Sequence, residues 1–233
     1  MHFCCLQHIA FEGPAGIADW IERRGDTWNS VPLHAGAPLP ELATVDAIVV
    51  LGGPMNIYQY RDHPWLRAEA RFIEAGLAAG KKVIGVCLGA QILANLLGSR
   101  VFQNPEREIG WYPVQFTEEA RALLPALPEF QTVLHWHGDT FDLPPDAVRL
   151  AASEACPEQG FLYRKQALAL QFHLEMTPET VAEIAEGCRD ELTPGRYVQS
   201  EEALRELSPL YAHGAQHLLA RMLDEFIGDS RRV

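Results

Sequence analysis

Residues 85–91, GVCLGAQ, place Cys87 between two glycines, at a point where a strand is expected to turn into a helix. A nucleophile at the tip of such a turn adopts a strained backbone conformation. Small residues two positions before and after it relieve the crowding, as Gly85 and Gly89 would here. The N-terminal N–H groups of the following helix would face the sulfur and favour the thiolate. A lone free cysteine is more often a small buried residue, but this spacing predicts an activated nucleophile.

A second stretch, QFHLEM, supplies the groups that such a nucleophile needs. A cysteine nucleophile requires a base, and the base requires a group that holds its tautomer. His173 follows an apolar run at 167–172, and Glu175, two residues further on, can point the same way. Alone, His-x-Glu is more often a surface feature. Together with Cys87, it predicts a Cys-His-Glu constellation.

The elements that must position these residues alternate along the chain. Apolar runs at 3–9, 26–31, 47–51 and 82–86 are expected as strands, and 16–22, 64–79 and 88–97 as helices. The continuous β-branched run 47–51 is typical of a strand buried on both faces of a parallel sheet. This alternation predicts a doubly wound α/β fold, in which functional sites form at the carboxyl ends of the strands.

The remaining chain has a different character. Short strands separated by Pro- and Gly-containing turns are expected at 110–116, 131–136, 148–152, 160–163 and 167–172, which indicates a mixed or antiparallel extension. Helix starts at 177–179 and 200–202 predict helices in the C-terminal third. No internal repeat or linker interrupts the sequence, so residues 1–233 are expected to form one domain.

Composition restricts the class of protein. The formal net charge is −12, and no Lys/Arg cluster is longer than a pair, which argues against nucleic acids and anionic membranes as partners. No run of about 18 apolar residues occurs, and the N-terminus lacks the layout of a signal peptide, so a cytoplasmic location is expected. The five cysteines form no CxxC pair, which fits a reducing compartment.

Three motifs carry a resemblance to a known family. Gly52-Gly53-Pro54 after a buried strand, the GVCLGAQ stretch and His173-Leu174-Glu175 resemble the class I glutamine amidotransferases, especially stand-alone proteins similar to the glutaminase domain of GMP synthase. The resemblance spans residues 45–190 and implies a flavodoxin-like fold. It implies that Cys87 attacks the glutamine side-chain amide and forms a γ-glutamyl thioester, with His173 as base and then acid and Glu175 as its orienting group.

The same resemblance implies further site residues and no cofactor. It assigns the oxyanion hole to the backbone N–H groups of Gly53 and Leu88, a role that suits fixed donors. It places Gly52 and Gln91 among the substrate-binding residues. The segment 107–114 resembles the part of the family that lies beside bound glutamine, and its residues Glu108, Ile109 and Gly110 are included in that prediction.

The stretch LHWHGDTF suggests a rival chemistry. His135, His137 and Asp139 alternate, so on a strand they would share one face, as the ligands of a metal do. The stretch resembles part of the metallo-β-lactamase signature, but Thr140 stands where a second histidine would follow the aspartate, and no metal is expected. The family resemblance makes it a His-Gly-Asp element at the mouth of the site, contacting a partner or shaping the pocket. A polar turn in which Asp139 bonds its own backbone is an equally credible interpretation.

Three functions remain open at this level. The first is hydrolysis of glutamine with ammonia passed to an unidentified acceptor. Ala90 stands where GMP synthase glutaminase domains commonly have His, which weakens the case for xanthosine monophosphate as that acceptor. No glycine-rich ATP-pyrophosphatase loop is present, so a separate synthetase subunit would be the partner. The second is hydrolysis of glutathione-like γ-glutamyl compounds, as in plant γ-glutamyl peptidases. The third is a non-catalytic binding protein, which the complete constellation disfavours.

Overall fold

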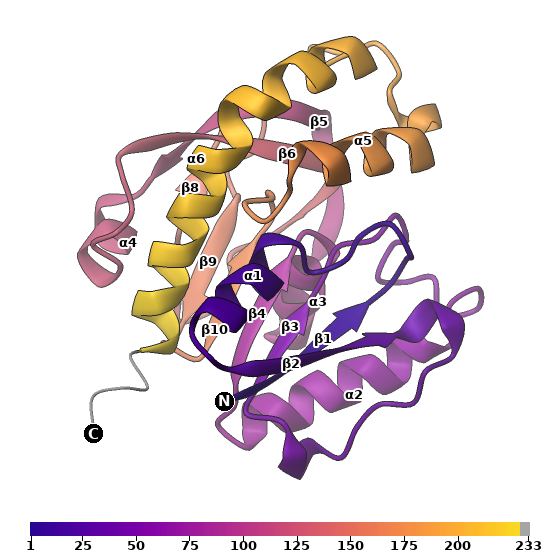
Figure 1. Ribbon diagram of the computed structural model, residues 1–233, viewed down its shortest axis with the longest axis vertical. Helices are drawn as coiled ribbons and strands as arrows, with labels where there is room; N and C mark the ends of the chain where they lie inside the picture. The colour runs from indigo at the N-terminus through magenta and orange to yellow at the C-terminus, as the bar shows by residue number, and fades with distance from the viewer. Residues whose placement is uncertain (229–233) are drawn as a thin grey trace.

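The computed structural model describes residues 1–228, which fold around a seven-stranded, mostly parallel sheet (Figure 1). In sheet order the strands are β2 (Thr27–Pro32), β1 (His2–Gln7), β3 (Ala47–Val50), β4 (Lys82–Val86), β10 (Ala167–Leu170), β9 (Gly160–Tyr163) and β7 (Ala147–Arg149). The first five are parallel, and β9 is antiparallel to both of its neighbours. The order of these five strands is that of flavodoxin-like folds, so the predicted fold class is confirmed.

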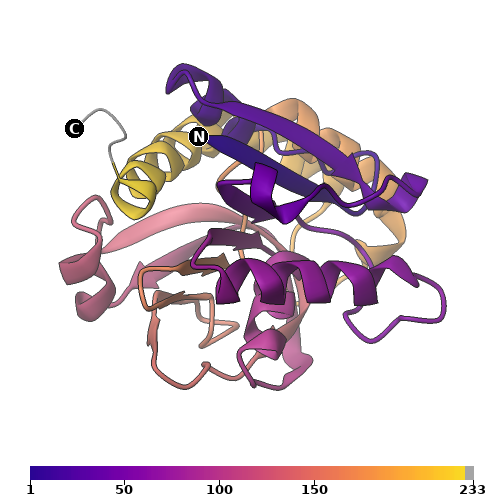
Figure 2. The same cartoon turned by 90° about the horizontal axis from the view of Figure 1, so that it is seen from below.

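Helices cover both faces of this sheet (Figure 2). They are α1 (Gly16–Arg23) and α6 (Glu201–Ile227) on one face, and α2 (Trp65–Ala78) and α3 (Leu88–Leu96) on the other. Successive β1 residues alternate between the two cores: Phe3 and Cys5 pack with α1 and α6, whereas Cys4 and Leu6 pack with α2 and α3. The central strands β3, β4 and β10 are buried on both faces, so their sequences are almost continuously apolar, as expected for a parallel sheet. Among residues 1–228, no helix has both the length and the hydropathy that a bilayer crossing requires.

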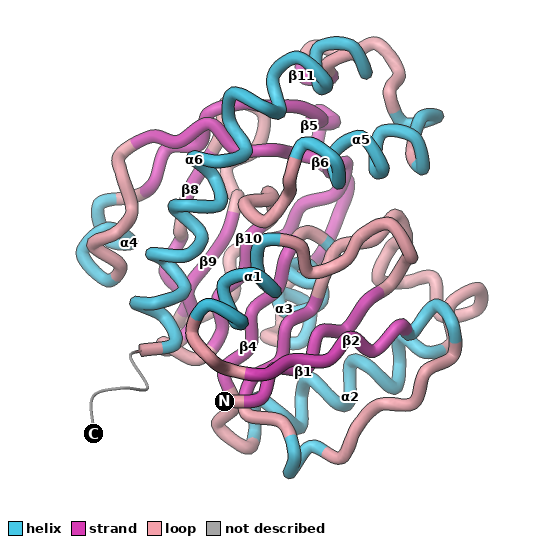
Figure 3. The backbone as a smooth tube through the Cα atoms, viewed as in Figure 1, coloured by secondary structure: helices cyan, strands magenta, loops and turns pink. Residues whose placement is uncertain are grey.

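A second sheet lies beside the first. Its strands are β11 (Tyr197–Val198), β5 (Val101–Phe116) and β6 (Phe130–Phe141), with β8 (Ala151–Ala152) paired to β5. α6 packs across β5 and β6, and α5 (Pro178–Gly187) packs against α6 (Figure 3). The expected strands at 110–116 and 131–136 are therefore parts of longer ones. The expected strand at 148–152 is divided between β7 and β8, which belong to different sheets.

Both expected C-terminal helix starts are present. The Thr177 side chain accepts from the Thr180 N–H, and the Thr180 hydroxyl accepts from the Thr177 N–H, forming a capping box ahead of Pro178. Ser200 caps α6 by accepting from the Ala203 N–H. The remaining short elements are α4 (Glu118–Leu123), which the sequence did not predict, and 3-10 turns at Leu33–Ala35, Leu42–Thr44 and Arg189–Glu191.

Candidate active site

Three adjacent parallel strands deliver the predicted residues to one edge of the sheet. β3 pairs with β4, and β4 pairs with β10, so the segments that follow them begin side by side. These segments contain Gly52, Cys87 and His173 respectively. A Cβ built on Gly52 would lie 3.3 Å from His173 Cε1 and 3.5 Å from Cys87 Cβ, so the α-carbon of this glycine marks where the two side chains converge.

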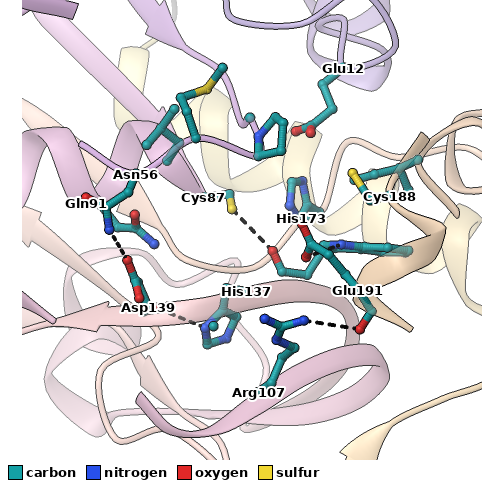
Figure 4. Close-up of a pocket in the computed structure, with 17 residues that line it drawn as sticks. Glu12, Asn56, Cys87, Gln91, Arg107, His137, Asp139, His173, Cys188 and Glu191 are labelled. Carbon is teal, nitrogen blue, oxygen red and sulfur yellow. Dashed lines mark hydrogen bonds between the residues drawn. The ribbon is translucent and has the colours of Figure 1, made fainter. Parts of the chain in front are cut away.

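Cys87 has the strained conformation that its sequence context predicts. Its φ is 51° and its ψ is −106°, and it stands immediately before α3. A Cβ on Gly85 would lie 2.6 Å from the backbone of Gly89, and one on Gly89 would overlap the Val50 carbonyl oxygen. Both glycines are therefore required for the helix to leave the sheet at this angle. The sharp turn directs the Cys87 side chain into the pocket shown in Figure 4.

His173 is held at both its backbone and its ring. Its N–H donates to the Leu134 carbonyl over 2.8 Å, which anchors the end of β10 to β6. Its Nδ1 lies 2.6 Å from Oε1 of Glu175, whose Oε2 accepts from the Leu174 N–H at 3.0 Å. With Nδ1 donating to the carboxylate, Nε2 is the nitrogen left for Cys87. The arrangement of base and orienting group is the one expected for a triad.

Electrostatics make His173 the proton acceptor of the pair. Burial raises the pKa of the Cys87 thiol above its ordinary value, and the adjacent His173 offsets only part of this rise. Burial also lowers the pKa of His173, but the Glu175 carboxylate and the Cys87 sulfur outweigh burial and raise that pKa well above its ordinary value. His173 is therefore a strong proton acceptor beside a buried thiol, which is the relationship between a nucleophile and its general base.

The residues expected to form an oxyanion hole lie beside the sulfur. Gly53 and Leu88 line the same pocket as Cys87. Among the described residues, the Gly53 N–H donates to no protein acceptor, so it is available to a ligand. Leu88 is the first residue of α3, where N–H groups have no partner within the helix. Two backbone donors thus lie where negative charge on a substrate oxygen could be stabilised.

Comparison with known proteins decides the family. The family model described as glutamine amidotransferase class-I matches residues 17–186 of the chain. The chain belongs to this family. A glutamine amidotransferase-like protein of Salmonella typhimurium, YfeJ, is 36% identical over 97% of the chain and 96% of its own length. A GMP synthase (glutamine-hydrolyzing) of Aliivibrio salmonicida is 35% identical over 57% of the chain but only 24% of its own length.

Solved structures agree with this membership. A glutamine amidotransferase of Thermotoga maritima superposes with a TM-score of 0.88 at 30% identity, covering 97% of this chain and 98% of its own. A glutamine amido transferase of Methylobacillus flagellatus gives a TM-score of 0.90 at 26% identity, covering 97% of this chain and 93% of its own. The class I amidotransferase architecture thus extends beyond the segment matched by the family model.

Of the predicted substrate-binding residues, Gln91 lines the pocket, whereas Gly52 and residues 108–110 do not. Gln91 lines the pocket and donates from Nε2 to Gln171 Oε1 over 3.2 Å. Glu108, Ile109 and Gly110 lie within β5 and do not line it, because strand pairing with β6 buries Glu108 and Ile109 behind the wall. The neighbouring Arg107 lines the pocket instead, and the substrate-binding role expected of residues 108–110 stays a prediction.

Residues 108, 135 and 137 form the one group, among the residues described, that could hold a metal ion. Glu108 Oε2 lies 3.5 Å from His135 Nδ1 and 3.3 Å from His137 Nε2. However, the Gln159 amide nitrogen donates to the same Oε2 over 2.6 Å and faces His137 Nε2 at 3.4 Å, so amide hydrogens occupy the position a cation would need. Ser153 also donates to Oε2. Glu108 is therefore held by hydrogen bonds from Gln159 and Ser153, whereas neither ring nitrogen of His135 has a hydrogen-bond partner among the described residues.

The three residues of the LHWHGDTF stretch do not act together. His135 and His137 face Glu108, and burial lowers the pKa of His135 to about 4, which keeps its ring neutral. Asp139 departs from this group and accepts a hydrogen bond from the Asn56 side-chain amide at the pocket rim. The His137 Nδ1 donates to the backbone carbonyl of Asp139 over 3.0 Å. The expectation that this element shapes the pocket agrees with these positions.

Several pocket residues were not predicted from the sequence. Glu12, Asn56, Cys188 and Glu191 line the cavity around Cys87, together with Arg107 of the expected segment 107–114 (Figure 4). Glu12 is 4% exposed, and its carboxylate accepts no hydrogen bond from the described residues. Burial raises the pKa of Glu12 to about 7, although His173 lowers it. The position of Glu12 in the sequence could have identified it. Glu12 follows β1, which is parallel and adjacent to β3, and functional sites form at the carboxyl ends of such strands.

Proposed function

We propose that this protein hydrolyses the side-chain amide of glutamine through a γ-glutamyl thioester on Cys87. The observation that carries the proposal is the convergence of a strained cysteine and a carboxylate-held histidine in one buried pocket. Cys87 stands at a φ of 51°, and the His173–Glu175 hydrogen bond measures 2.6 Å. Membership of the class I amidotransferase family agrees with this chemistry.

The first half of the reaction forms the thioester. The Cys87 proton passes to His173 Nε2 as the sulfur bonds to the amide carbon, and the carbonyl π electrons move onto the oxygen. The N–H groups of Gly53 and Leu88 bind this oxyanion, because they are fixed backbone donors beside the sulfur. When the intermediate collapses, the C–N bond breaks, and His173 transfers its proton to the departing ammonia.

The second half regenerates the thiol. His173 takes a proton from a water molecule that attacks the thioester carbon, and the same two N–H groups bind the second oxyanion. The C–S bond then breaks, glutamate leaves, and Cys87 recovers the proton from His173. Glu175 accepts from Nδ1 throughout, which keeps Nε2 directed at the reacting atoms and stabilises the imidazolium.

Delivery of the ammonia is part of the same proposal. The chain matches only 24% of the length of the GMP synthase of Aliivibrio salmonicida. We propose that an acceptor, if one is used, binds to a separate synthetase subunit that docks at the pocket mouth. Isolation of a complex, followed by transfer of ¹⁵N from [amide-¹⁵N]glutamine to a bound acceptor, would identify both.

Covalent labelling tests the proposed nucleophile. Brief incubation with 6-diazo-5-oxo-norleucine, a glutamine-shaped electrophile, should give one adduct, which peptide mass spectrometry should locate on Cys87. Cys87→Ser should lose the adduct, and His173→Ala should form it more slowly. Cys188 provides an internal control because it lines the same pocket, while burial raises its pKa to about 12. Equal labelling of Cys188, or none at Cys87, would contradict the proposal.

The leaving group is tested by a substrate series. Ammonia release from glutamine is compared with amine release from γ-glutamyl peptides and from glutathione conjugates, at equal concentrations and with Cys87→Ser as the blank. A kcat/KM that is highest for glutamine supports the amidase. A preference for the larger compounds, by tenfold or more, would make this protein a γ-glutamyl hydrolase with the same nucleophile and base.

A further inference from the structure

A buried ionisable pair lies directly behind the Gly52-Gly53 turn. His8 follows β1, Glu69 lies in α2, and both side chains are 0% exposed. The His8 Nε2 is 2.7 Å from Glu69 Oε1, and the His8 Nδ1 is 2.9 Å from the Gly52 carbonyl oxygen. Neither residue lines the pocket that contains Cys87, and the reaction described above does not use them.

The protonation state of His8 follows from its partners. A carbonyl oxygen can only accept a hydrogen bond, so Nδ1 must carry a hydrogen. A carboxylate also only accepts, so Nε2 carries one as well, and the ring is an imidazolium paired with Glu69. Burial lowers the pKa of His8, but Glu69 and the Gly52 carbonyl outweigh burial and raise it, which agrees with this state. The Gly52 carbonyl thus receives a charge-assisted hydrogen bond.

The ring that donates this bond is held on two sides by one helix. Trp65 and Glu69 are four residues apart in α2 and therefore lie on the same face. The Trp65 ring stacks on His8 with centroids 5.4 Å apart and planes inclined by 12°, while Glu69 binds the edge of the ring. The direction of the Nδ1–H bond is consequently set by α2, which is a rigid element of the scaffold.

Fixing the Gly52 carbonyl also fixes the Gly53 N–H. The two groups belong to one planar trans peptide, in which they point in opposite directions. Glycine on both sides of a peptide gives it unusual freedom to rotate, because no side chain opposes the turn. With the carbonyl tied to His8, the N–H points away from the His8 ring, and Gly53 itself lines the pocket that contains Cys87.

We propose that His8 and Glu69 are positioning residues for the oxyanion hole, holding the Gly52–Gly53 peptide so that the Gly53 N–H faces the substrate oxygen. The inference rests on the proposed amidase function, because an oxyanion must form for the donor to matter. The imidazolium also polarises the peptide to which it is bonded and so makes the Gly53 N–H a stronger donor. Neither side chain touches the reacting atoms.

The test separates the oxyanion hole from the nucleophile. Hydrolysis of glutamine passes through an oxyanion, whereas alkylation of Cys87 by iodoacetamide is a direct displacement that forms none. Two variants are compared in a Glu69→Gln background, so that neither leaves a buried carboxylate without its partner. His8→Leu removes the donor to Gly52. His8→Asn keeps a donor, because the Asn Nδ2 occupies a place similar to that of the histidine Nδ1.

Loss of one oxyanion donor lowers kcat by ~100-fold or more. We expect a decrease in kcat of this size for His8→Leu/Glu69→Gln. The KM and the alkylation rate of Cys87 should change less than about threefold. His8→Asn/Glu69→Gln should recover at least about tenfold of the lost kcat. Thermal denaturation monitors folding of both variants. As a matched control, His63→Leu removes the other histidine beside Trp65, at 5.5 Å, without touching Gly52, and should keep the wild-type kcat.

The outcomes bear on different proposals. An unchanged kcat in His8→Leu/Glu69→Gln, equal kcat values in the two double variants, or parallel loss of turnover and alkylation would each overturn the positioning role. A wild-type protein whose Cys87 is alkylated but which releases neither ammonia from glutamine nor amine from γ-glutamyl compounds would instead overturn the hydrolase function, and the positioning role with it. That result appears in the wild type alone, so the two failures are distinguishable.

Discussion

The Cys87 N–H donates a hydrogen bond of 2.7 Å to the carbonyl of Leu170. This bond continues the pairing of β4 with β10 beyond their last paired residues, so nucleophile and base enter the pocket from neighbouring strands. The relative position of Cys87 and His173 is therefore set by backbone pairing. Substitution of either side chain should leave the other in place, which makes single variants informative about chemistry.

The strained backbone at Cys87 predicts that a glycine variant is more stable than an alanine variant. Its φ of 51° lies in a region that side chains rarely adopt and glycine adopts freely. Cys87→Gly should therefore be more stable than Cys87→Ala by ~1 kcal/mol, within the range of ~1–3 kcal/mol that such conformations cost. Urea denaturation of the two inactive variants measures the difference. A less stable glycine variant would show that the surroundings impose no strain here.

The Glu175 carboxylate should matter for turnover more than for substrate binding. Glu175→Gln preserves the size of the side chain but removes the charge that holds the His173 tautomer and stabilises its protonated form. We expect kcat to fall by ~10²–10⁴-fold with little change in KM. Steady-state ammonia release gives both parameters. A raised KM at constant kcat would assign Glu175 to substrate binding instead.

Gly89 is required for the turn that carries Cys87. In Gly89→Ala the new methyl group would overlap the Val50 carbonyl oxygen, which belongs to the backbone and cannot move aside alone. The free energy of unfolding should fall by about 1–3 kcal/mol, and activity should fall with it, because α3 must shift. Gly13→Ala is the matched control, since a Cβ there meets nothing within 4 Å. Equal stability of the two variants would contradict this account.

The buried Glu12 carboxyl predicts a specific pH dependence of stability. Burial raises its pKa to about 7, so between the ordinary carboxyl pKa and pH 7 the folded state retains a proton that the unfolded state has released. Stability of the wild type therefore decreases as pH rises through that interval. Glu12→Gln removes the penalty and should be more stable by up to ~3 kcal/mol at pH 8, but not below about pH 4.

Denaturation curves of wild type and Glu12→Gln across this pH range measure the difference. Glu74→Gln, which changes an exposed glutamate of α2, serves as the control and should follow the wild type. Parallel curves for wild type and Glu12→Gln would mean that Glu12 retains its ordinary pKa. Glu12 would then be charged at neutral pH, and its charge would raise the pKa of the Cys87 thiol.

The parallel part of the fold was predictable because its elements are locally encoded. Both faces of its central strands are buried, so continuous apolar runs identified them to within a few residues. The second sheet was less predictable. The first half of β5 is polar and contains Pro105, and its pairing with β6 is irregular between Gln103 and Glu108, so no period of two marks it. A strand that is stabilised mainly by pairing with its partner need not show an apolar pattern in its own sequence.

The sequence by itself predicted the proposed nucleophile, base and orienting group, because each lies in a motif with local geometric requirements. Gly85 and Gly89 indicate the turn at Cys87, and Glu175 lies two positions after His173. Only the tertiary structure decided which buried charges surround them. His8 contacts Gly52 and Glu69, which lie 44 and 61 positions further along the chain. No local sequence motif marks either contact. Burial and charge pairing arise only when distant segments pack, so sequence spacing does not reveal them.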